Sequence, residues 1–203
     1  MIDERFTILG SIIAMIGGLS YLIATIKGRV KPNKVSFLLW SFAPLIAFTA
    51  QIKEGVGFLL ALITFVAGIE PFLIFVASFL NKKAEWKLNR FDLACGAVAV
   101  LGLILWQITK TGNIAIGFSI LADGMAALPT IIKSFNYPET ESGWPYFTTV
   151  ISAVITLLAV KNYSFITIGF TVYLFTVCLI IFVLVQFKLG KTLSKAFGLK
   201  QAN

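Results

Sequence analysis

Apolar residues gather along this chain in seven long stretches separated by short polar segments. The stretches run over 6–26, 35–52, 56–80, 91–108, 114–133, 145–160 and 165–187. Most are close to the length of about 20 residues with which a helix crosses the hydrocarbon core of a bilayer. The sequence lacks the alternating segments of about ten residues that are typical of a membrane β-barrel. Because backbone groups in lipid must pair within a helix or a closed barrel, the pattern predicts an all-α integral membrane protein with seven transmembrane helices.

Composition supports the same fold class. The chain has 203 residues, of which 58% are hydrophobic and 13% are charged, and its mean hydropathy is +0.92. A soluble domain of this size could not bury so much apolar surface, so the lipid bilayer is an expected partner. The sequence has no endoplasmic-reticulum retention signal and no long glycosylated segment, so we expect the prokaryotic cytoplasmic (inner) membrane.

The net charge of +8 is unevenly divided between the two ends of the predicted helices. If the helices alternate in direction, 13 basic residues fall on one side and 4 on the other, which accounts for all 17. The larger group is Lys27, Arg29, Lys31, Lys34, Lys82, Lys83, Lys87, Arg90, Lys133, Lys188, Lys191, Lys195 and Lys200, and the smaller is Arg5, Lys53, Lys110 and Lys161. Cytoplasmic loops carry an excess of lysine and arginine, which predicts an outside N-terminus, a cytoplasmic C-terminus and an odd number of passes. This distribution argues against a nucleic-acid partner.

Two segments about 106 residues apart are similar, and each joins two apolar stretches. Residues 20–49 align with residues 125–155 when one residue is inserted after Ile131. The matched pairs are Thr25 with Thr130, Lys27 with Lys133, Pro32 with Pro138, Ser36 with Ser142, and Trp40 with Tyr146. Such internal repeats are common in transporters that bind a solute between two halves.

The repeat predicts how the seven helices are organised. A tandem copy of three helices would be inverted in the membrane, and one extra helix between the copies restores its orientation. We therefore predict a 3+1+3 arrangement with parallel halves: residues 1–80 are the first repeat, 81–110 hold the linker loop and fourth helix, 111–187 are the second repeat, and 188–203 form a basic cytoplasmic tail. In this tail, Leu189, Leu193 and Phe197 are spaced as on one face of a helix lying on anionic lipid; a disordered tail is the alternative.

The second repeated segment resembles a known signature. Leu128-Pro129-Thr130-Ile131-Ile132-Lys133, followed by Pro138-Glu139-Thr140-Glu141-Ser142 and Pro145-Tyr146, is similar to the PQ-loop motif, and especially to its form in SWEET (MtN3-type) transporters. The first segment departs from the motif, with Ala24 at the proline position and Leu39 opposite Pro145. The resemblance implies seven helices in a 3+1+3 fold and transport of a small solute.

Two carboxylates lie within predicted spans, Glu70 and Asp123. Charged groups inside a membrane are costly and usually face a cavity or a partner. The offset of 106 pairs Glu70 with Thr176, and the SWEET resemblance implies that this position binds substrate in each repeat. Glu70 and Asp123 are also the candidates for proton coupling, since the chain contains no histidine. The structural alternatives are that Glu70 fills the hydrogen-bond gap left by Pro71 and that Asp123 makes a buried contact with a neighbouring helix.

Aromatic residues and prolines form a second set of candidates. Tyr21 is a candidate to line the substrate cavity, with packing as the alternative. Trp40 and Tyr146 are candidates for a cytoplasmic gate, and interfacial anchoring is the other reading. Pro44, Pro129 and Pro145 are candidate hinges because proline breaks helices and frees carbonyls; the alternative is that proline is simply common in membrane helices.

These observations predict a transporter that moves a small polar solute, such as a sugar, an amino acid or a related metabolite, by alternating access, with proton coupling as an open option. The sequence contains no nucleophile–histidine pair and no metal-ligand cluster, so we expect neither an enzyme nor a cofactor or metal. A homo-oligomer is compatible with the sequence. The rival hypothesis is a membrane receptor or scaffold of the same fold, which binds a partner through its basic cytoplasmic loops.

Overall fold

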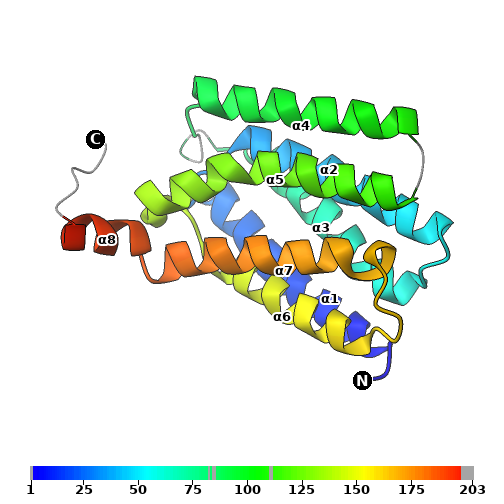
Figure 1. Cartoon of the computed structure of the whole chain (residues 1–203). Helices are drawn as coiled ribbons and strands as arrows, with labels where there is room; N and C mark the ends of the chain where they lie inside the picture. The colour runs from blue at the N-terminus through cyan, green and yellow to red at the C-terminus, as the bar shows by residue number, and fades with distance from the viewer. Residues whose placement is uncertain (1, 82, 84–85, 110–111, 198–203) are drawn as a thin grey trace.

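The computed structural model describes residues 2–197 except 82, 84–85 and 110–111, and every element in these residues is helical (Figure 1). The elements are α1 (Phe6–Ile26), α2 (Lys34–Lys53), α3 (Phe58–Ala77), α4 (Arg90–Thr109), α5 (Gly112–Asn136), the 3₁₀ turn η2 (Pro138–Thr140), α6 (Trp144–Ala159), α7 (Phe165–Gln186) and α8 (Leu189–Phe197). Each of the seven apolar stretches coincides with one of the helices α1 to α7, and α8 lies within the basic tail. Lys82, Lys110 and Lys200 lie outside the described residues.

Within the described residues, five helices are long and apolar enough to cross a membrane: α1, α2, α3, α5 and α7. The helix α6 is apolar but shorter, with 16 residues. Side chains on the outer faces of these helices are also apolar and exposed, including Ile12, Ile16 and Leu19 on α1. Exposed apolar faces of this length suit lipid rather than water, so the chain is an all-helical membrane protein.

The helices pack in two groups of the same internal order. In the first group α3 packs against both α1 and α2, and in the second group α7 packs against both α5 and α6. The groups meet where α1 packs on α6 and where α2 packs on α5. The helix α4 packs on α5 and α2 at the side of the bundle (Figure 1).

Small residues bring the two groups close together. A Cβ atom on Gly17 of α1 would lie 2.9 Å from the Cα of Pro145, at the start of α6. Further along, a Cβ on Gly10 would lie 3.2 Å from the Ser152 hydroxyl. Glycine, alanine, serine and threonine at a helix interface let two backbones approach closely in a membrane. The α1–α6 contact therefore depends on the lack of side chains at these glycines.

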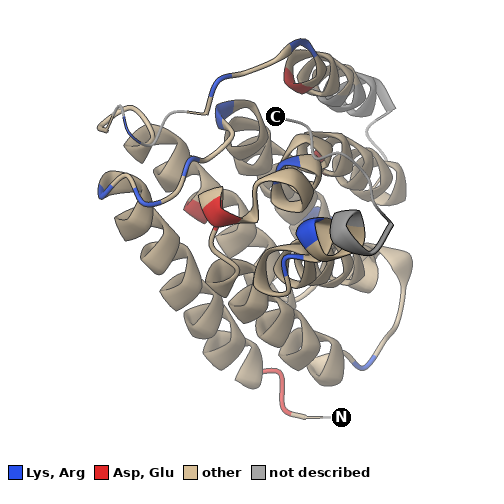
Figure 2. Ribbon diagram, turned by 90° about the vertical axis from the view of Figure 1, so that its left-hand side faces the viewer, with Lys and Arg blue, Asp and Glu red and all other residues tan. Residues whose placement is uncertain are grey.

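The helices alternate in direction (Figure 1). The α1–α2, α3–α4, α5–α6 and α7–α8 connections therefore lie at one end of the bundle, and the α2–α3, α4–α5 and α6–α7 connections lie at the other. Figure 2 looks onto the end that carries α8, where described lysines and arginines gather in the segments around 27–34, 83–90, 133 and 188–191. At the other end lie Arg5, before α1, Lys53, the last residue of α2, and Lys161, in the α6–α7 connection. We call the end that carries α8 the basic end.

Candidate functional site

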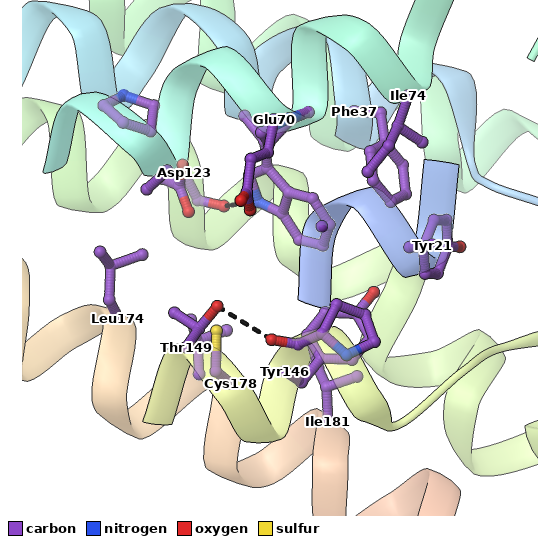
Figure 3. Close-up of a pocket in the computed structure, with 17 residues that line it drawn as sticks. Tyr21, Phe37, Glu70, Ile74, Asp123, Tyr146, Thr149, Leu174, Cys178 and Ile181 are labelled. Carbon is purple, nitrogen blue, oxygen red and sulfur yellow. Dashed lines mark hydrogen bonds between the residues drawn. The ribbon is translucent and has the colours of Figure 1, made fainter. Parts of the chain in front are cut away.

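A central pocket lies between the two groups of helices (Figure 3). It holds about 630 Å³ of empty space, counting the open space at its edge. Six helices line it: Gly18 and Tyr21 from α1; Phe37, Trp40 and Pro44 from α2; Ala67, Glu70, Pro71 and Ile74 from α3; Asp123 from α5; Pro145, Tyr146 and Thr149 from α6; and Leu174, Val177, Cys178 and Ile181 from α7.

The pocket gathers seven of the nine residues that the sequence singled out. These are Tyr21, Trp40, Pro44, Glu70, Asp123, Pro145 and Tyr146. They come from five helices and lie as far as 125 positions apart in the chain (Tyr146 minus Tyr21). Pro129 is buried within α5 and does not line the pocket. Thr176 does not line it either.

Thr176 lies on a different face of α7 from the one that the offset of 106 predicted. Its side chain is exposed, and its hydroxyl donates a hydrogen bond of 2.9 Å to the Val172 carbonyl of its own helix. The pocket residues of α3 and α7 match at an offset of 107 rather than 106, in the pairs Ala67 with Leu174, Glu70 with Val177, Pro71 with Cys178, and Ile74 with Ile181. One residue turns a helix face by about 100°, so the counterpart of Glu70 is Val177, and Thr176 points out of the bundle.

Glu70 reaches the pocket beside a glycine of α1. A Cβ on Gly18 would lie 2.6 Å from Glu70 Oε1, so the missing side chain leaves room for the carboxyl group. The buried Oε1 atom has no hydrogen-bond partner among the described residues. Oε1 therefore does not fill the hydrogen-bond gap that Pro71 leaves in the helix, and this oxygen remains free to face the cavity.

Asp123 is held from one side and free on the other. Its side chain is 2% exposed, and Oδ2 accepts a hydrogen bond of 2.5 Å from the Tyr173 hydroxyl on α7. Oδ1 is buried and has no partner within the described part of the chain. The contact with Tyr173 is the helix–helix contact that the structural alternative requires, but it uses only one of the two oxygens. The other remains available to a ligand.

The two carboxylates lie on helices that are not equivalent in the two groups. At the offset of 105 that pairs Thr25 with Thr130, Gly18 is the counterpart of Asp123. The first group of helices thus carries its acid on α3 and a glycine on α1, and the second carries its acid on α5 and Val177 on α7. Each group contributes one acid to the same cavity, from a different helix.

Aromatic rings form a continuous wall on one side of the pocket. The rings of Tyr21 and Phe37 stack with centroids 5.3 Å apart, and Phe37 meets Trp40 edge to face at 5.2 Å. The Trp40 indole N–H donates to the backbone carbonyl of Asp123 at 3.3 Å, which fixes the ring across the boundary between the groups. The hydroxyl of Tyr146 is buried and, among the described residues, has no partner.

Prolines leave backbone acceptors in the pocket lining. Pro44 and Pro71 lie within α2 and α3, and a proline cannot donate to the carbonyl four residues earlier. The carbonyls concerned belong to Trp40 and Ala67, both of which line the pocket. Of the hydroxyls, Thr149 already donates to the Pro145 carbonyl at 2.9 Å. Among the described lining residues, the side-chain oxygen atoms without a partner are one carboxyl oxygen each of Glu70 and Asp123, which accept, and the Tyr146 hydroxyl, which can donate or accept.

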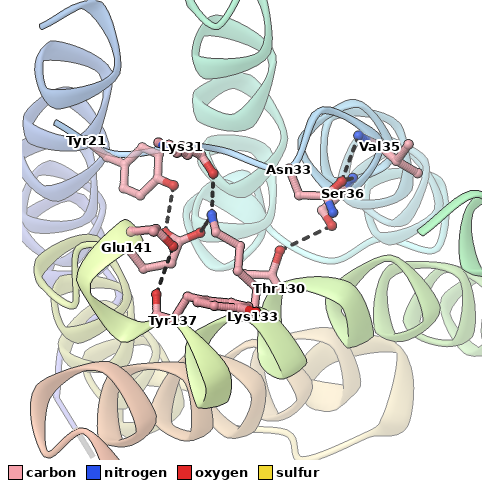
Figure 4. Close-up of polar contacts among 10 residues, drawn as sticks. Tyr21, Lys31, Asn33, Val35, Ser36, Thr130, Lys133, Tyr137 and Glu141 are labelled. Carbon is pink, nitrogen blue, oxygen red and sulfur yellow. Dashed lines mark hydrogen bonds and ion pairs between the residues drawn. The ribbon is translucent and has the colours of Figure 1, made fainter. Parts of the chain in front are cut away.

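A buried polar network links Tyr21, which lines the pocket, to the connections at the basic end. Figure 4 shows its contacts. The Tyr21 hydroxyl donates to Glu141 Oε2 at 2.7 Å, and Glu141 Oε1 forms an ion pair of 2.7 Å with Lys133. Lys133 also donates to the Lys31 carbonyl and lies 4.9 Å from the centroid of the Trp86 ring. The network joins α1 and the α1–α2 connection to the segment between α5 and α6, so it ties one group of helices to the other.

Sequence reasoning did not assign a role to this network. Lys133 and Glu141 are part of the quoted motif, and opposite charges eight residues apart within an apolar chain are the signal that points to a buried pair. Nearby, Glu139 accepts a hydrogen bond of 2.7 Å from Lys191 of α8, and this contact lowers the pKa of the Glu139 carboxyl below its usual value. Phe37, Tyr173 and Cys178 were also missed, since apolar and aromatic residues are too frequent here to stand out.

No protein-family model matches the chain, and no curated protein or solved structure matches it either.

Proposed function

We propose that the protein is a SWEET- and PQ-loop-like transporter that moves a small polar solute across a membrane by alternating access. The observation that carries the proposal is the central pocket, which is lined by both groups of helices and contains one carboxyl oxygen each of Glu70 and Asp123 that has no partner among the described residues. A polar group buried without a partner is costly, and a bound solute that pairs with it offsets this cost. A site between two halves is where transporters of repeated structure bind their substrate.

The proposal includes seven transmembrane helices in a 3+1+3 arrangement, an outside N-terminus and a cytoplasmic C-terminus. The equivalent packing of α1, α2, α3 and of α5, α6, α7 supports two parallel halves. The excess of lysine and arginine at the basic end supports a cytoplasmic location for that end.

Alternating access requires the halves to move against each other, and two features favour such movement. The contact between α1 and α6 uses small residues such as Gly10 and Gly17, which interlock less than large side chains. Pro44 within α2 and Pro145 at the start of α6 interrupt or end the helices beside the pocket, and such positions are where helices bend. In this mechanism Trp40 and Tyr146 close the pocket towards the basic end.

Uptake by proteoliposomes tests the proposal. The purified protein is reconstituted, and solute exchange is measured for sugars, amino acids, amines and vitamins, with empty liposomes as the blank. We expect exchange of at least one solute, and its loss in the double variant Glu70→Gln/Asp123→Asn. The matched control is Glu54→Gln, since Glu54 is exposed and lies outside the central pocket.

The rival receptor or scaffold has a distinct outcome. Absence of exchange for every solute, together with capture of a protein partner that is lost when Lys27, Arg29, Lys31 and Lys34 are neutralised, would replace the transporter with that function. Both results come from the same purified protein.

A further inference from the structure

We infer that the solute of this pocket is a protonated or quaternary organic amine, held by Glu70 and Asp123 against the ring wall of Tyr21, Phe37 and Trp40. The inference rests on the proposed function and names the chemical class of its solute. It follows from three properties of the lining: its charge, its hydrogen-bonding groups and its aromatic faces.

The charge of the lining is one-sided. The described residues that line the pocket include two carboxylates and neither a lysine nor an arginine, and the chain has no histidine. The buried Lys133 does not belong to this lining, and it is already paired with Glu141 at 2.7 Å. In their ionised form, two acids in a low-dielectric site without a cation of the protein are stabilised by a cation from outside.

The hydrogen-bonding groups lead to the same class. Asp123 Oδ1 and Glu70 Oε1 have no donor within the described residues, and the carbonyls of Trp40 and Ala67 lack the amide donor that proline replaces. Asp123 is only 2% exposed, so its free oxygen lies inside the protein and not at its surface. An ammonium group supplies donors, or positive charge alone, to such acceptors.

The aromatic faces distinguish an organic cation from a metal ion. Tyr21 stacks on Phe37, and Phe37 meets Trp40 edge to face, so the three rings form a continuous wall; cations are attracted to the faces of aromatic rings. Leu174, Val177 and Ile181 cover the α7 side of the pocket with apolar surface. A metal ion prefers several oxygen ligands and retains water, whereas an alkyl- or aryl-ammonium matches both the acids and the apolar surface.

The experiment compares amines with neutral molecules of the same shape. The thermal stability of the detergent-purified wild-type protein is measured with choline and with 3,3-dimethyl-1-butanol, and with phenethylamine and with 2-phenylethanol. We expect the ammonium member of at least one pair to raise the melting temperature, since a ligand of the folded state stabilises it by mass action, and the neutral member to have no effect. Equal shifts within every pair, or no shift with either ammonium, would overturn the inference.

Variants locate the site of the effect. Glu70→Gln and Asp123→Asn keep the shape of each side chain, and in Asp123→Asn the new amide oxygen can still accept from Tyr173. We expect each to weaken ammonium binding roughly tenfold or more, as expected for the loss of one charge-assisted contact. Glu54→Gln should bind as the wild type does. Unchanged affinity in both pocket variants, in folded protein with a wild-type melting temperature, would refute binding at this site.

A second readout uses the thiol that the pocket already contains. Cys178 is a free, buried cysteine of the lining, and in a Cys95→Ser background it reports occupancy by its rate of reaction with a small methanethiosulfonate reagent. The bound amine should protect Cys178, and its neutral partner should not. If the liposomes exchange a sugar or another neutral solute and no amine, the proposed transport function stands and the amine inference fails; if they exchange nothing, the transport proposal itself fails.

Discussion

The Tyr21 hydroxyl donates a hydrogen bond of 2.7 Å to Glu141 Oε2, and the same tyrosine lines the pocket. Tyr21 belongs to α1, and Glu141 lies in the connection between α5 and α6. The bond therefore joins the two groups of helices on the side of the pocket that faces the basic end (Figure 4). We refer to Tyr21, Lys133 and Glu141 as the latch.

Tyr21→Phe should loosen the latch without changing the ring that faces the pocket. The loss of a buried hydrogen bond to a charged group lowers the free energy of unfolding by about 1.5–3 kcal/mol. With α1 released from the α5–α6 connection, we expect Cys178 to react faster with a methanethiosulfonate reagent in a Cys95→Ser background. The measurements are thermal unfolding and the labelling rate.

The control is Tyr163→Phe. Tyr163 is exposed, and its hydroxyl donates to the Leu157 carbonyl at 2.8 Å in the α6–α7 connection, at the end of the bundle opposite the latch. We expect the labelling rate of Cys178 to stay at the wild-type value in this variant. The same rate in Tyr21→Phe as in Tyr163→Phe would show that the latch does not restrict access to the pocket.

The ion pair of the latch should show strong coupling. The side chains of Lys133 and Glu141 are 1% and 0% exposed, and removal of one partner leaves the other charge buried and unpaired, at a cost of about 3–5 kcal/mol. We expect Lys133→Met and Glu141→Gln each to lower the free energy of unfolding by about this amount. The double variant should lose less than the sum, with a coupling energy of order 1–3 kcal/mol.

An exposed pair serves as the reference for this cycle. Lys161 and Glu4 approach to 3.8 Å with side chains that are 69% and 38% exposed, and such pairs contribute about 1 kcal/mol or less. Equal coupling in the two cycles, measured by unfolding in the same detergent, would contradict a stabilising latch.

The helix positions could be predicted from the sequence because the surrounding solvent is apolar on every side. Runs such as 6–26 and 165–187 coincide with α1 and with α7 (Phe165–Gln186) to within one residue. Helix ends there are set by the change from apolar to polar residues. The order in which the helices pack could not be predicted in this way, since apolar residues cover all faces and hydropathy does not show which face meets a neighbour.

The candidate site was predictable where a residue is unusual for its surroundings. Glu70 and Asp123 were found because a carboxylate is rare within a membrane span, and both line the pocket. Thr176 was misplaced because the offset between the repeats changes from 105 to 107 along the chain, and a change of one residue rotates a helix face by about 100°. The latch was missed because its strength depends on burial, which the residue types alone do not reveal.

Gly18→Ala should disturb the site as well as the fold. The added Cβ would lie 2.6 Å from Glu70 Oε1, and the flexible glutamate can move away at a cost of about 1–3 kcal/mol. Its carboxyl group then leaves the position in which it faces the cavity. We expect the affinity for the solute to fall roughly tenfold, the loss that corresponds to about 1.4 kcal/mol, as measured by thermal shift over a range of solute concentrations.

Gly117→Ala is the matched control for this change. Gly117 is also within a helix, α5, and a Cβ there would meet nothing within 4 Å. Alanine is the better helix former by about 1 kcal/mol, so this variant should be as stable as the wild type or slightly more stable, with unchanged affinity. A loss of affinity in Gly117→Ala equal to that in Gly18→Ala would show that the space beside Glu70 has no special role in binding.

The carboxylates also lead to a prediction about the coupling of transport to protons. If Glu70 or Asp123 carries a proton through the transport cycle, uptake driven by a pH gradient requires that group to bind and release it, which an amide cannot do. We expect Glu70→Gln or Asp123→Asn to make uptake independent of pH, from slightly acidic to slightly alkaline solution, when uptake is measured in proteoliposomes at saturating solute. Exchange of solute without a gradient should persist in the same variant, because exchange needs no net movement of protons.

Glu54→Gln, whose carboxylate is exposed, should keep the wild-type pH dependence. The same pH dependence in both pocket variants as in the wild type would assign the coupling to other groups and leave Glu70 and Asp123 as ligands of the solute alone.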